Sequence, residues 1–512
     1  MDRTVLIWSP NPATGAYEPR VKLGSSGGVI GGSVGNSLLG YTHARWTAGG
    51  NGVAAVGYGG SINLWYPSSS SDGVNHLPPP PTPANTGDND ANRTLPNLWK
   101  LGGTVTGHFR PVKDLAWDPL GCYLLTCGED QTTRLWSPTL VDGRVGPWAE
   151  LGRPQVHGYE VVSLCPLSHP RHRFASGADE KFVRLFDAPE SAVDRMVKKG
   201  GYVRGEGEDE GIEGGREKRA YVPALGLSNR GGDVDRLKEE DIEDSDEEDK
   251  GEEEGKFINL PGERELGVKT LWLEVGKMGG AEGEILTLAS NATCDNATRG
   301  EKPVLLSTNK ARDEKSAVIR VWDVETNVCE GVLEGGHKSS VCCLGFNREG
   351  TKVASSGKDR RLCIWSVKKG EDPGLRVRVD GAHKRIVWCL DWCKGEGEKG
   401  KYLATGSRDG TVKIWDTSTS PPETVQTITI GEPVTAMAFG FEPNPNLLAL
   451  GTESGVISVL EIGEDFTSLK VFIDKMPNGH KKTVNKIAFR PGQEVPELAS
   501  CGEDHGVRIW SL

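Results

Sequence analysis

Short stretches that mix apolar and polar positions recur along almost the whole chain. Typical examples are VKDLAW (112–117) and VNKIAF (484–489), and both lie between segments rich in Gly, Asn and Asp. Alternation with turn residues on either side is typical of β-strands that bury one face. No apolar run approaches the roughly 20 residues that a membrane-spanning helix needs. The pattern predicts an all-β protein built from many short strands.

Four of these stretches share one frame, in which a Ser or Thr, an Asp and a Trp recur at fixed spacing and a His lies upstream of them. The Ser or Thr lies four residues before the Asp, and the Asp lies six residues before the Trp. The sets are His108, Thr126, Asp130 and Trp136; His337, Ser355, Asp359 and Trp365; His383, Thr405, Asp409 and Trp415; and His480, Ser500, Asp504 and Trp510. Asp favours a tight turn between strands, and the four polar groups can satisfy one another inside an apolar unit.

Weaker copies of this frame fill the gaps between the four sets. They end at Phe186, Trp322, Leu460 and Trp65, and the copy at Trp322 has no Ser or Asp at the expected spacing. Apart from two long gaps, the aromatic positions are 43 to 57 residues apart. This repeat resembles the WD40 family, whose four-stranded blades recur with that period. The resemblance implies an all-β WD40 propeller and covers nearly the whole chain.

The repeat count suggests a domain organisation. Seven aromatic positions follow His108, so we expect residues 96–512 to form a seven-bladed propeller. We expect its last blade to take its fourth strand from LPNLWKLGG (95–103) and so close the ring. Residues 1–67 hold about one and a half blades, which we expect to be the remnant of a preceding propeller that is truncated at its N-terminus. The alternative is a short adapter packed on the complete propeller. Residues 68–95 are a Ser/Pro/Asn-rich linker.

Charge is concentrated in one segment. The chain carries a net −12, and residues 239–254 hold twelve Asp and Glu and one Lys, which leaves about −1 for the rest. This tract lies in an insertion at about 190–265, between the third and fourth strands of the second blade, and its composition predicts disorder. Ser245, in DSDEED, matches an acidophilic kinase site. The alternative is that the tract is only a solvated spacer.

Catalytic and metal-binding patterns are weak in this sequence. A Ser–His–Asp set that recurs four times with a Trp indicates a structural role, because an active site needs no copies. Two Gly-x-Ser-x-Gly matches lie in one Gly-rich loop, and no His/Cys cluster has zinc spacing. The eleven Cys include no Cys-x-x-Cys pair, which favours a reducing compartment, the cytoplasm or the nucleus. We therefore expect no enzyme activity, no metal, no cofactor and no small-molecule substrate.

Basic residues follow the repeated His or flank the Asp turn. Those that we select as partner- or RNA-binding candidates are Arg385, Arg408, Lys384, Arg360, Arg361 and Arg110. Both loop types lie on one face of a propeller, so this face is expected to be locally positive. The hypothesis is that it contacts an acidic protein surface or the backbone of an RNA. The alternative is ordinary decoration of solvated loops.

Several stretches are more specific than the general repeat. SGADEKFVRLF (176–186), VPALGLSN (222–229), KTLWLEV (269–275) and RIVWCLDW (385–392) occur in the order found in the Elongator complex protein 2 family, and the chain closely resembles that family's second propeller. The resemblance implies a non-catalytic scaffold subunit that binds the largest scaffold subunit and the catalytic subunit of Elongator. It also implies a role in 5-carboxymethyl-type modification of the tRNA wobble uridine.

Some features depart from that family. Gly279 and Gly280 replace a Gly-His pair, and the acidic insertion has no clear counterpart. The family has two seven-bladed propellers, so more than five N-terminal blades would be missing here. Alternative functions are another WD40 adaptor, such as a substrate receptor of a ubiquitin ligase, or a direct nucleic-acid binder. An enzyme is the third alternative, and the repeated sets argue against it.

Overall fold

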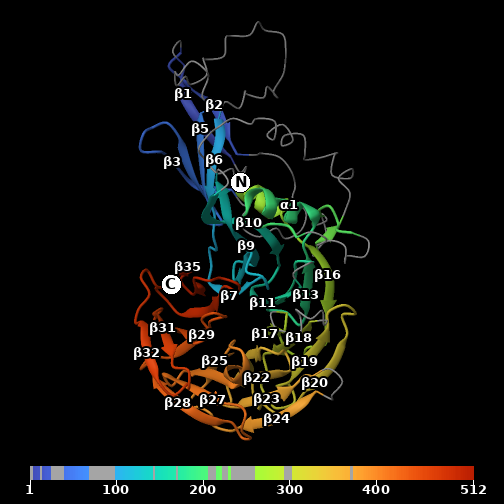
Figure 1. Cartoon of the computed structure of the whole chain (residues 1–512). Coiled ribbons are helices and arrows are strands. Elements are labelled where there is room, and N and C mark those ends of the chain that lie inside the picture. Colours follow the sequence, from blue (N-terminus) through green and yellow to red (C-terminus); the bar gives the residue numbers. More distant parts are fainter. Residues whose placement is uncertain are drawn as a thin grey trace.

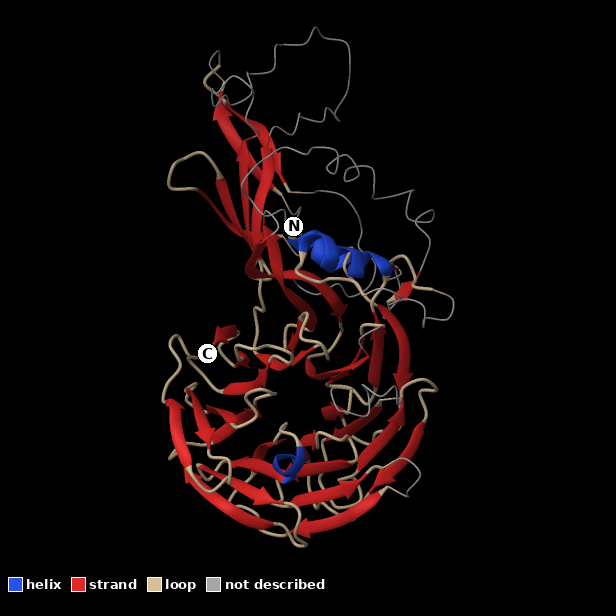
Figure 2. Ribbon diagram, viewed as in Figure 1, coloured by secondary structure: helices blue, strands red, loops and turns tan. Residues whose placement is uncertain are grey.

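The protein is described by a computed structural model. It covers residues 4–11, 14–24, 40–67, 99–141, 144–168, 171–205, 215–221, 229–231, 260–292, 303–368 and 373–512. Within these ranges, short antiparallel strands dominate (Figure 2). The helices in the described part of the chain are α1 (Glu190–Lys199), α2 (Glu263–Val268) and a short 3-10 helix over Gly397–Lys401.

From Val112 onward, the described residues form seven antiparallel sheets of three or four strands, which we number as blades one to seven. Blade one comprises β7 (Val112–Trp117), β8 (Leu124–Gly128), β9 (Thr132–Val141) and β10 (Arg144–Val156); blade two β11 (Val161–Ser168), β12 (Arg173–Ala178), β13 (Val183–Asp187) and β16 (Leu273–Met278); blade three β17 (Ile285–Ser290), β18 (Val304–Asn309), β19 (Ile319–Asp323) and β20 (Cys329–Leu333); blade four β21 (Val341–Phe346), β22 (Lys352–Gly357), β23 (Leu362–Ser366) and β24 (Gly374–Val379); blade five β25 (Val387–Trp392), β26 (Tyr402–Ser407), β27 (Thr411–Asp416) and β28 (Glu423–Thr429); blade six β29 (Val434–Phe439), β30 (Leu447–Thr452), β31 (Ile457–Ile462) and β32 (Leu469–Ile473); and blade seven β33 (Val484–Phe489), β34 (Glu497–Gly502) and β35 (Val507–Ser511).

The blades form a closed ring. The first strand of each blade contacts the first strand of the next, in the order β7, β11, β17, β21, β25, β29, β33 and back to β7 (Figure 1). Apolar side chains fill the space between neighbouring blades; one such cluster joins blades five and six through Met437, Phe439 and Ile414. This packing removes the open sheet faces that a single blade would expose. The prediction of an all-β WD40 propeller is confirmed.

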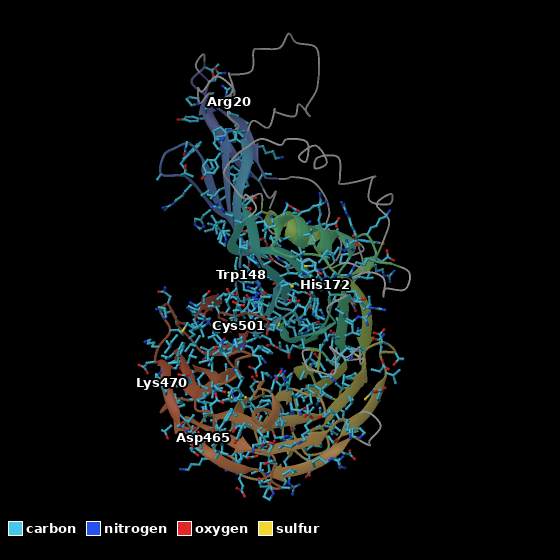
Figure 3. All side chains as sticks on the ribbon, viewed as in Figure 1. Arg20, Trp148, His172, Asp465, Lys470 and Cys501 are labelled. Atoms are coloured by element: carbon cyan, nitrogen blue, oxygen red, sulfur yellow. The ribbon has the colours of Figure 1, made fainter. Side chains whose placement is uncertain are left out.

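Side chains hold blade seven to blade one. The Trp117 indole N–H donates to the Ala488 carbonyl over 3.2 Å, and the Asn485 amide donates to the Val112 carbonyl over 2.8 Å. The Arg490 guanidinium lies 5.1 Å from the ring of Trp148 and 5.5 Å from that of Trp117. Figure 3 labels Trp148, on blade one, and Cys501, on blade seven, at this junction. The ring is therefore closed here by packing and side-chain hydrogen bonds.

The predicted exchange of a fourth strand into blade seven is wrong in this structure. Residues 99–105 form β6 (Trp99–Val105), which pairs with β5 (Ile62–Pro67) and not with β35. Together with β3 (Tyr41–Trp46) and β4 (Val53–Gly57), these strands make a four-stranded sheet, and the described part of blade seven has three strands. The same backbone hydrogen bonds are available at either edge, and β6 satisfies those of the strand that precedes it in the chain.

The N-terminal segment also contains a two-stranded sheet of β1 (Val5–Pro10) and β2 (Tyr17–Leu23). Its apolar side chains pack against the sheet of β3 to β6 in one cluster that includes Ile7, Val21 and Trp65. Because β6 belongs to the sheet of β3 to β6, the N-terminal unit includes residues up to Val105, beyond the boundary at residue 67 expected for the N-terminal remnant. Most of the expected linker lies outside the described residues.

The insertion is partly ordered, contrary to the expectation of disorder. β13 pairs with β16 across it, and between them lie α1, β14 (Ala220–Tyr221), β15 (Arg230–Gly231) and α2. The helix α1 forms because Ala192, Val193 and Met196 lie on one face and are buried against blade one. Ser245 and the acidic tract lie outside the described residues.

Candidate functional site

Two of the four repeated sets come together as complete hydrogen-bonded tetrads, and a third lacks only the direct bond between its His and its Asp. In blade one, His108 Nδ1 lies 2.9 Å from Asp130 Oδ2, and its Nε2 lies 2.8 Å from Thr126 Oγ1. The Trp136 indole donates to the same Thr126 hydroxyl over 2.9 Å. The chain of contacts joins the loop before the first strand, the second strand with the turn after it, and the third strand.

Blades four and five repeat this geometry. Ser355 Oγ lies 2.7 Å from both His337 Nε2 and Trp365 Nε1, and His337 Nδ1 lies 3.1 Å from Asp359. In blade five, Thr405 lies 2.8 Å from both His383 Nε2 and Trp415 Nε1. The second nitrogen of His383 lies nearer to Thr411 Oγ1, at 3.1 Å, than to Asp409, at 3.4 Å. Both ring nitrogens of each His are thus engaged.

The fourth set is incomplete. His480 contacts Asp504 and Ser500, each over 2.7 Å, but the Trp510 indole donates to the Pro477 carbonyl over 3.1 Å. The expected contact between Trp510 and Ser500 is therefore wrong. Trp510 lies on β35, which has no outer strand beside it in the described part of the chain. No neighbouring strand therefore holds its indole against the Ser500 hydroxyl.

Two further polar sets were missed by the sequence reasoning. In blade three, the Trp322 indole donates to Ser307 Oγ over 2.8 Å, although the turn between them is longer than in the other blades. In blade two, His157 Nε2 lies 3.1 Å from Glu180, which also binds Arg184. His157, before β11, could have been found because it is followed by Gly, as His108 is preceded by Gly in the first set. Its partner was missed because Glu180 stands where the other sets have Asp.

Burial sets the protonation state of the tetrads. Removal from water lowers the pKa of His383 to about 4 and also lowers the pKa of His108 and His480. Burial raises the pKa of Asp130, but His108 and Arg134 outweigh it and keep that pKa below its ordinary value. At neutral pH, His108, His383 and His480 are therefore neutral imidazoles beside carboxylates.

A chain of buried ion pairs extends the first tetrad toward the insertion. Arg134 bridges Asp130 and Glu150 over 3.0 and 2.9 Å, and Arg153 bridges Glu150 and Glu263 over 3.0 and 2.7 Å. Glu263 begins α2, so this network fixes the end of the insertion to blade one. Each charge has an opposite partner, as burial requires.

Exposed basic residues gather on blades four and five. The Lys384 N–H donates to Asp409, the Arg408 N–H to the Ile386 carbonyl, and the Ala382 N–H to the Arg360 carbonyl, over 2.9, 2.9 and 3.0 Å. These bonds place the turn of blade four and both loops of blade five side by side. Among the described residues, no ion pair is found for Arg360, Lys384, Arg385 or Arg408, and all four are exposed. We call these four residues the basic patch.

Two of the expected contact residues do not belong to this patch. Arg361 is buried, donates to the Gly336 carbonyl over 2.8 Å and pairs with Asp380 over 2.7 Å. Its guanidinium is therefore not available to a partner, and its selection was wrong. Arg110 is half-exposed, lies on blade one and pairs with Glu160 over 3.9 Å.

Other chemistry is sparse in the described ranges. No group of three or more His, Cys, Asp or Glu there is placed to hold a metal ion. Burial raises the pKa of the thiols of Cys127, Cys389 and Cys501 well above the ordinary value, so they remain protonated. No helix in the described part of the chain is long and apolar enough to span a bilayer.

The repeat agrees with a family model. The WD domain, G-beta repeat, matches residues 99–137, 327–366, 374–416 and 469–511. Each match ends next to the Trp of one of the four repeated sets. With the closed ring of sheets, this defines the class: the chain is a WD40-repeat β-propeller protein.

Similarity to curated proteins covers the full chain. Elongator complex protein 2 of Drosophila melanogaster is 33% identical over 538 residues, which include 100% of this chain and 61% of that protein. The proteins of the same name from Arabidopsis thaliana and Homo sapiens are 29% and 27% identical, over 100% and 99% of this chain and 60% and 61% of their own lengths. The chain is therefore similar along its whole length to proteins named Elongator complex protein 2, and it spans about 60% of the length of these relatives.

Proposed function

We propose that this chain is a scaffold subunit of an Elongator complex. The observation that carries this proposal is the similarity to Elongator complex protein 2 along the full chain. The proposed partners are the largest scaffold subunit and the catalytic subunit. Through them the chain would support the 5-carboxymethyl-type modification of the wobble uridine of tRNAs, in the cytoplasm or the nucleus.

The geometry of the tetrads supports a non-catalytic role. In blade four, both nitrogens of His337 are engaged, and the Ser355 hydroxyl is held between His337 and Trp365. Ser355 is fully buried, so a substrate cannot reach its hydroxyl. A nucleophile must be accessible and free to transfer its proton. The tetrads instead fix the loops of the blades that carry them, as a rigid binding platform requires.

The basic patch is the proposed contact surface within this role. Four exposed cations lie on two neighbouring blades, which suits an acidic protein surface or an RNA backbone. The patch is local, because Glu432 and Glu453 occupy the corresponding loops of blade six. Arg385 and Arg408 are the preferred contacts.

Copurification tests the complex. The endogenous protein, tagged at its C-terminus and recovered at mild salt, is expected to bring down the scaffold and catalytic subunits of Elongator, identified by mass spectrometry. Recovery of ubiquitin-ligase components without them would contradict the proposal and favour a different WD40 adaptor.

Charge reversal tests the patch. A variant with Arg385→Glu and Arg408→Glu is expected to lose most of the recovered partner or tRNA, with an unchanged unfolding midpoint. If the patch contacts RNA, the slope of log affinity against log salt falls by about two. The matched control is Lys470→Glu with Lys475→Glu on the outer rim of blade six, which changes the net charge equally. Equal recovery with both variants would contradict a role for the patch.

A further inference from the structure

The first strand of every blade carries a bulge at its second residue. In each blade the pairing with the second strand shifts there, so that the register skips this residue. It is Lys113 in blade one, Trp388 in blade five and Asn485 in blade seven. We call it the bulge position. A bulge redirects a side chain, so the residue at this position is available for contacts outside its own sheet.

Blades one and seven show where a side chain at the bulge position lies. The Lys113 ammonium lies 2.7 Å from the carboxylate of Glu129, the residue before the Asp of its own blade's turn. It also lies 2.7 Å from Glu503, the corresponding residue of the preceding blade, which is blade seven. The Asn485 amide donates to Glu503 of its own blade over 2.9 Å. A side chain at the bulge position therefore lies between the Asp turns of its own blade and of the blade before it.

In blade five the two corresponding neighbours are cations. The residue before the Asp is Arg408 in blade five and Lys358 in blade four, and both are exposed. The Arg408 N–H donates over 2.9 Å to the carbonyl of Ile386, two residues before Trp388, and the Lys358 N–H donates to the Ser340 carbonyl over 3.1 Å. These bonds fix both turns beside the first strands of their blades. The repeat thus places the Trp388 indole between two exposed cations.

The Trp388 side chain is aromatic surface that the fold does not use. It is half-buried, and among the described residues neither an acceptor for its N–H nor a ring or cation stacked on its indole is found. Two other Trp of blade five are different. Trp392 and Trp415 are buried and donate to the Gly345 carbonyl and the Thr405 hydroxyl over 3.0 and 2.8 Å. The indole of Trp388 is therefore available to a ligand.

We propose that Trp388 and the basic patch form a binding site for single-stranded RNA. An unpaired base stacks on the indole, and the phosphates on either side of it contact Arg408, Lys358 and Arg385. This inference rests on the proposed role of the basic patch as a contact surface. Cations alone suit an acidic protein as well as RNA, but an available indole beside them adds the flat surface that a base requires. Because every base can stack in this way, little sequence preference is expected.

The charges around the site give the RNA a direction. The Ile430 N–H donates to the Gly410 carbonyl over 2.8 Å, which places the loop that carries Glu432 beside the turn of blade five. The Glu432 carboxylate accepts from the Ser454 hydroxyl and would repel a phosphate. On the other side, Arg360 of blade four continues the positive surface. The RNA is therefore expected to run from blade five toward blade four.

Fluorescence anisotropy with the purified full chain tests the stacking contact. The probe is a labelled oligouridylate of about ten nucleotides, a length that a single-strand site covers. Trp388→Leu introduces the residue that blade three has at the bulge position, Leu286. It is expected to weaken binding of the probe about 5- to 100-fold, the effect of one stacked base. Trp388→Phe keeps an aromatic ring and is expected to weaken binding less. The matched control is Trp8→Leu, since Trp8 is 52% exposed on the N-terminal unit, and it is expected to bind as the unmodified chain does.

Two further arms separate stacking from charge. Trp388→Leu is expected to leave the slope of log affinity against log salt unchanged, whereas Lys358→Ala with Arg408→Ala is expected to lower it by about 1.4, or about 0.7 for each phosphate contact. With the probe annealed to its complement, Trp388→Leu is expected to leave the affinity unchanged, because a paired base does not reach the indole. A loss of affinity for this duplex equal to the loss for the single strand would contradict stacking.

Two other results would overturn the proposal. If the unmodified chain and Trp388→Leu bind the probe equally, with equal unfolding midpoints in urea, no base stacks on the indole. Trp388→Thr, which introduces the residue that blade six has at the bulge position, replaces Trp388→Leu if the latter does not fold, with the same expectation. If a polyglutamate peptide of the same charge binds the unmodified chain as tightly as the probe, the patch fits an acidic protein surface instead. The assay contains no partner subunit, so a failed copurification with Elongator subunits contradicts the proposed function alone, and equal binding by the Trp388 variant contradicts the stacking site alone.

Discussion

Replacement of Trp117 tests how the ring closes without a shared strand. Its side chain is 4% exposed and packs between blades one and seven, 5.4 Å from the ring of Trp148 and 5.5 Å from the Arg490 guanidinium. Truncation of a buried Trp to Ala costs about 3–5 kcal/mol, because it removes the packed area and leaves a cavity. Trp117→Phe keeps the aromatic contacts but removes the donor to the Ala488 carbonyl, which costs about 1 kcal/mol.

The assay is urea unfolding followed by far-UV circular dichroism, with amide exchange to locate the change. Trp117→Ala is expected to lower the unfolding free energy by the larger amount and to speed exchange in β33 and β7. The matched control is Trp8→Ala, since Trp8 is 52% exposed and its loss is expected to change stability by less than about 0.5 kcal/mol. The reasoning is refuted if Trp117→Ala behaves like this control, or if Trp117→Phe costs as much as Trp117→Ala.

Two further outcomes follow from the tetrads. The pKa of His383 is lowered to about 4 by burial, so the unfolded chain binds more protons below the ordinary His pKa of about 6.5, and stability falls as the pH drops from about 6.5 to 4. At pH 5.5, His383 lowers the free energy of unfolding by about 1.4 kcal/mol relative to neutral pH. As the pH is lowered, the urea midpoint of His383→Gln should therefore decrease less steeply than that of the exposed control His43→Gln. Ser355→Ala deprives both His337 and Trp365 of a partner, so in the same assay it is expected to cost about 1–3 kcal/mol more than Ser500→Ala, which deprives only His480; equal costs would contradict the geometry.

Much of the fold was predictable because the repeat is local. The spacing of His, Ser or Thr, Asp and Trp recurs within about 30 residues, and the strands and turns that carry it are formed by neighbouring residues. Blade three shows the limit of this reasoning. Ser307 still binds Trp322, but a longer turn shifts it out of the expected position, and only the paired strands β18 and β19 bring the two together.

The sequence predicted that the candidate contact surface is basic, but not which of its basic residues are exposed. Arg360 and Arg361 are adjacent in the sequence, yet Arg360 is exposed and Arg361 is buried against Gly336 and Asp380. Adjacent residues of a turn point in different directions, so the identity of a residue does not determine its exposure. The bonds of Lys384, Ile386 and Ala382 across the loops decide which cations share one surface.

The strand pattern, the WD40 class and two complete tetrads could be read from the sequence, because they depend on spacing within one blade. The position of β6, the hydrogen bond of Trp510 to Pro477 and the order of α1 in the insertion depend on tertiary contacts. The physical reason is that strand edges offer the same backbone hydrogen bonds wherever they occur. The choice between two such edges depends on which one the folded chain places beside the strand.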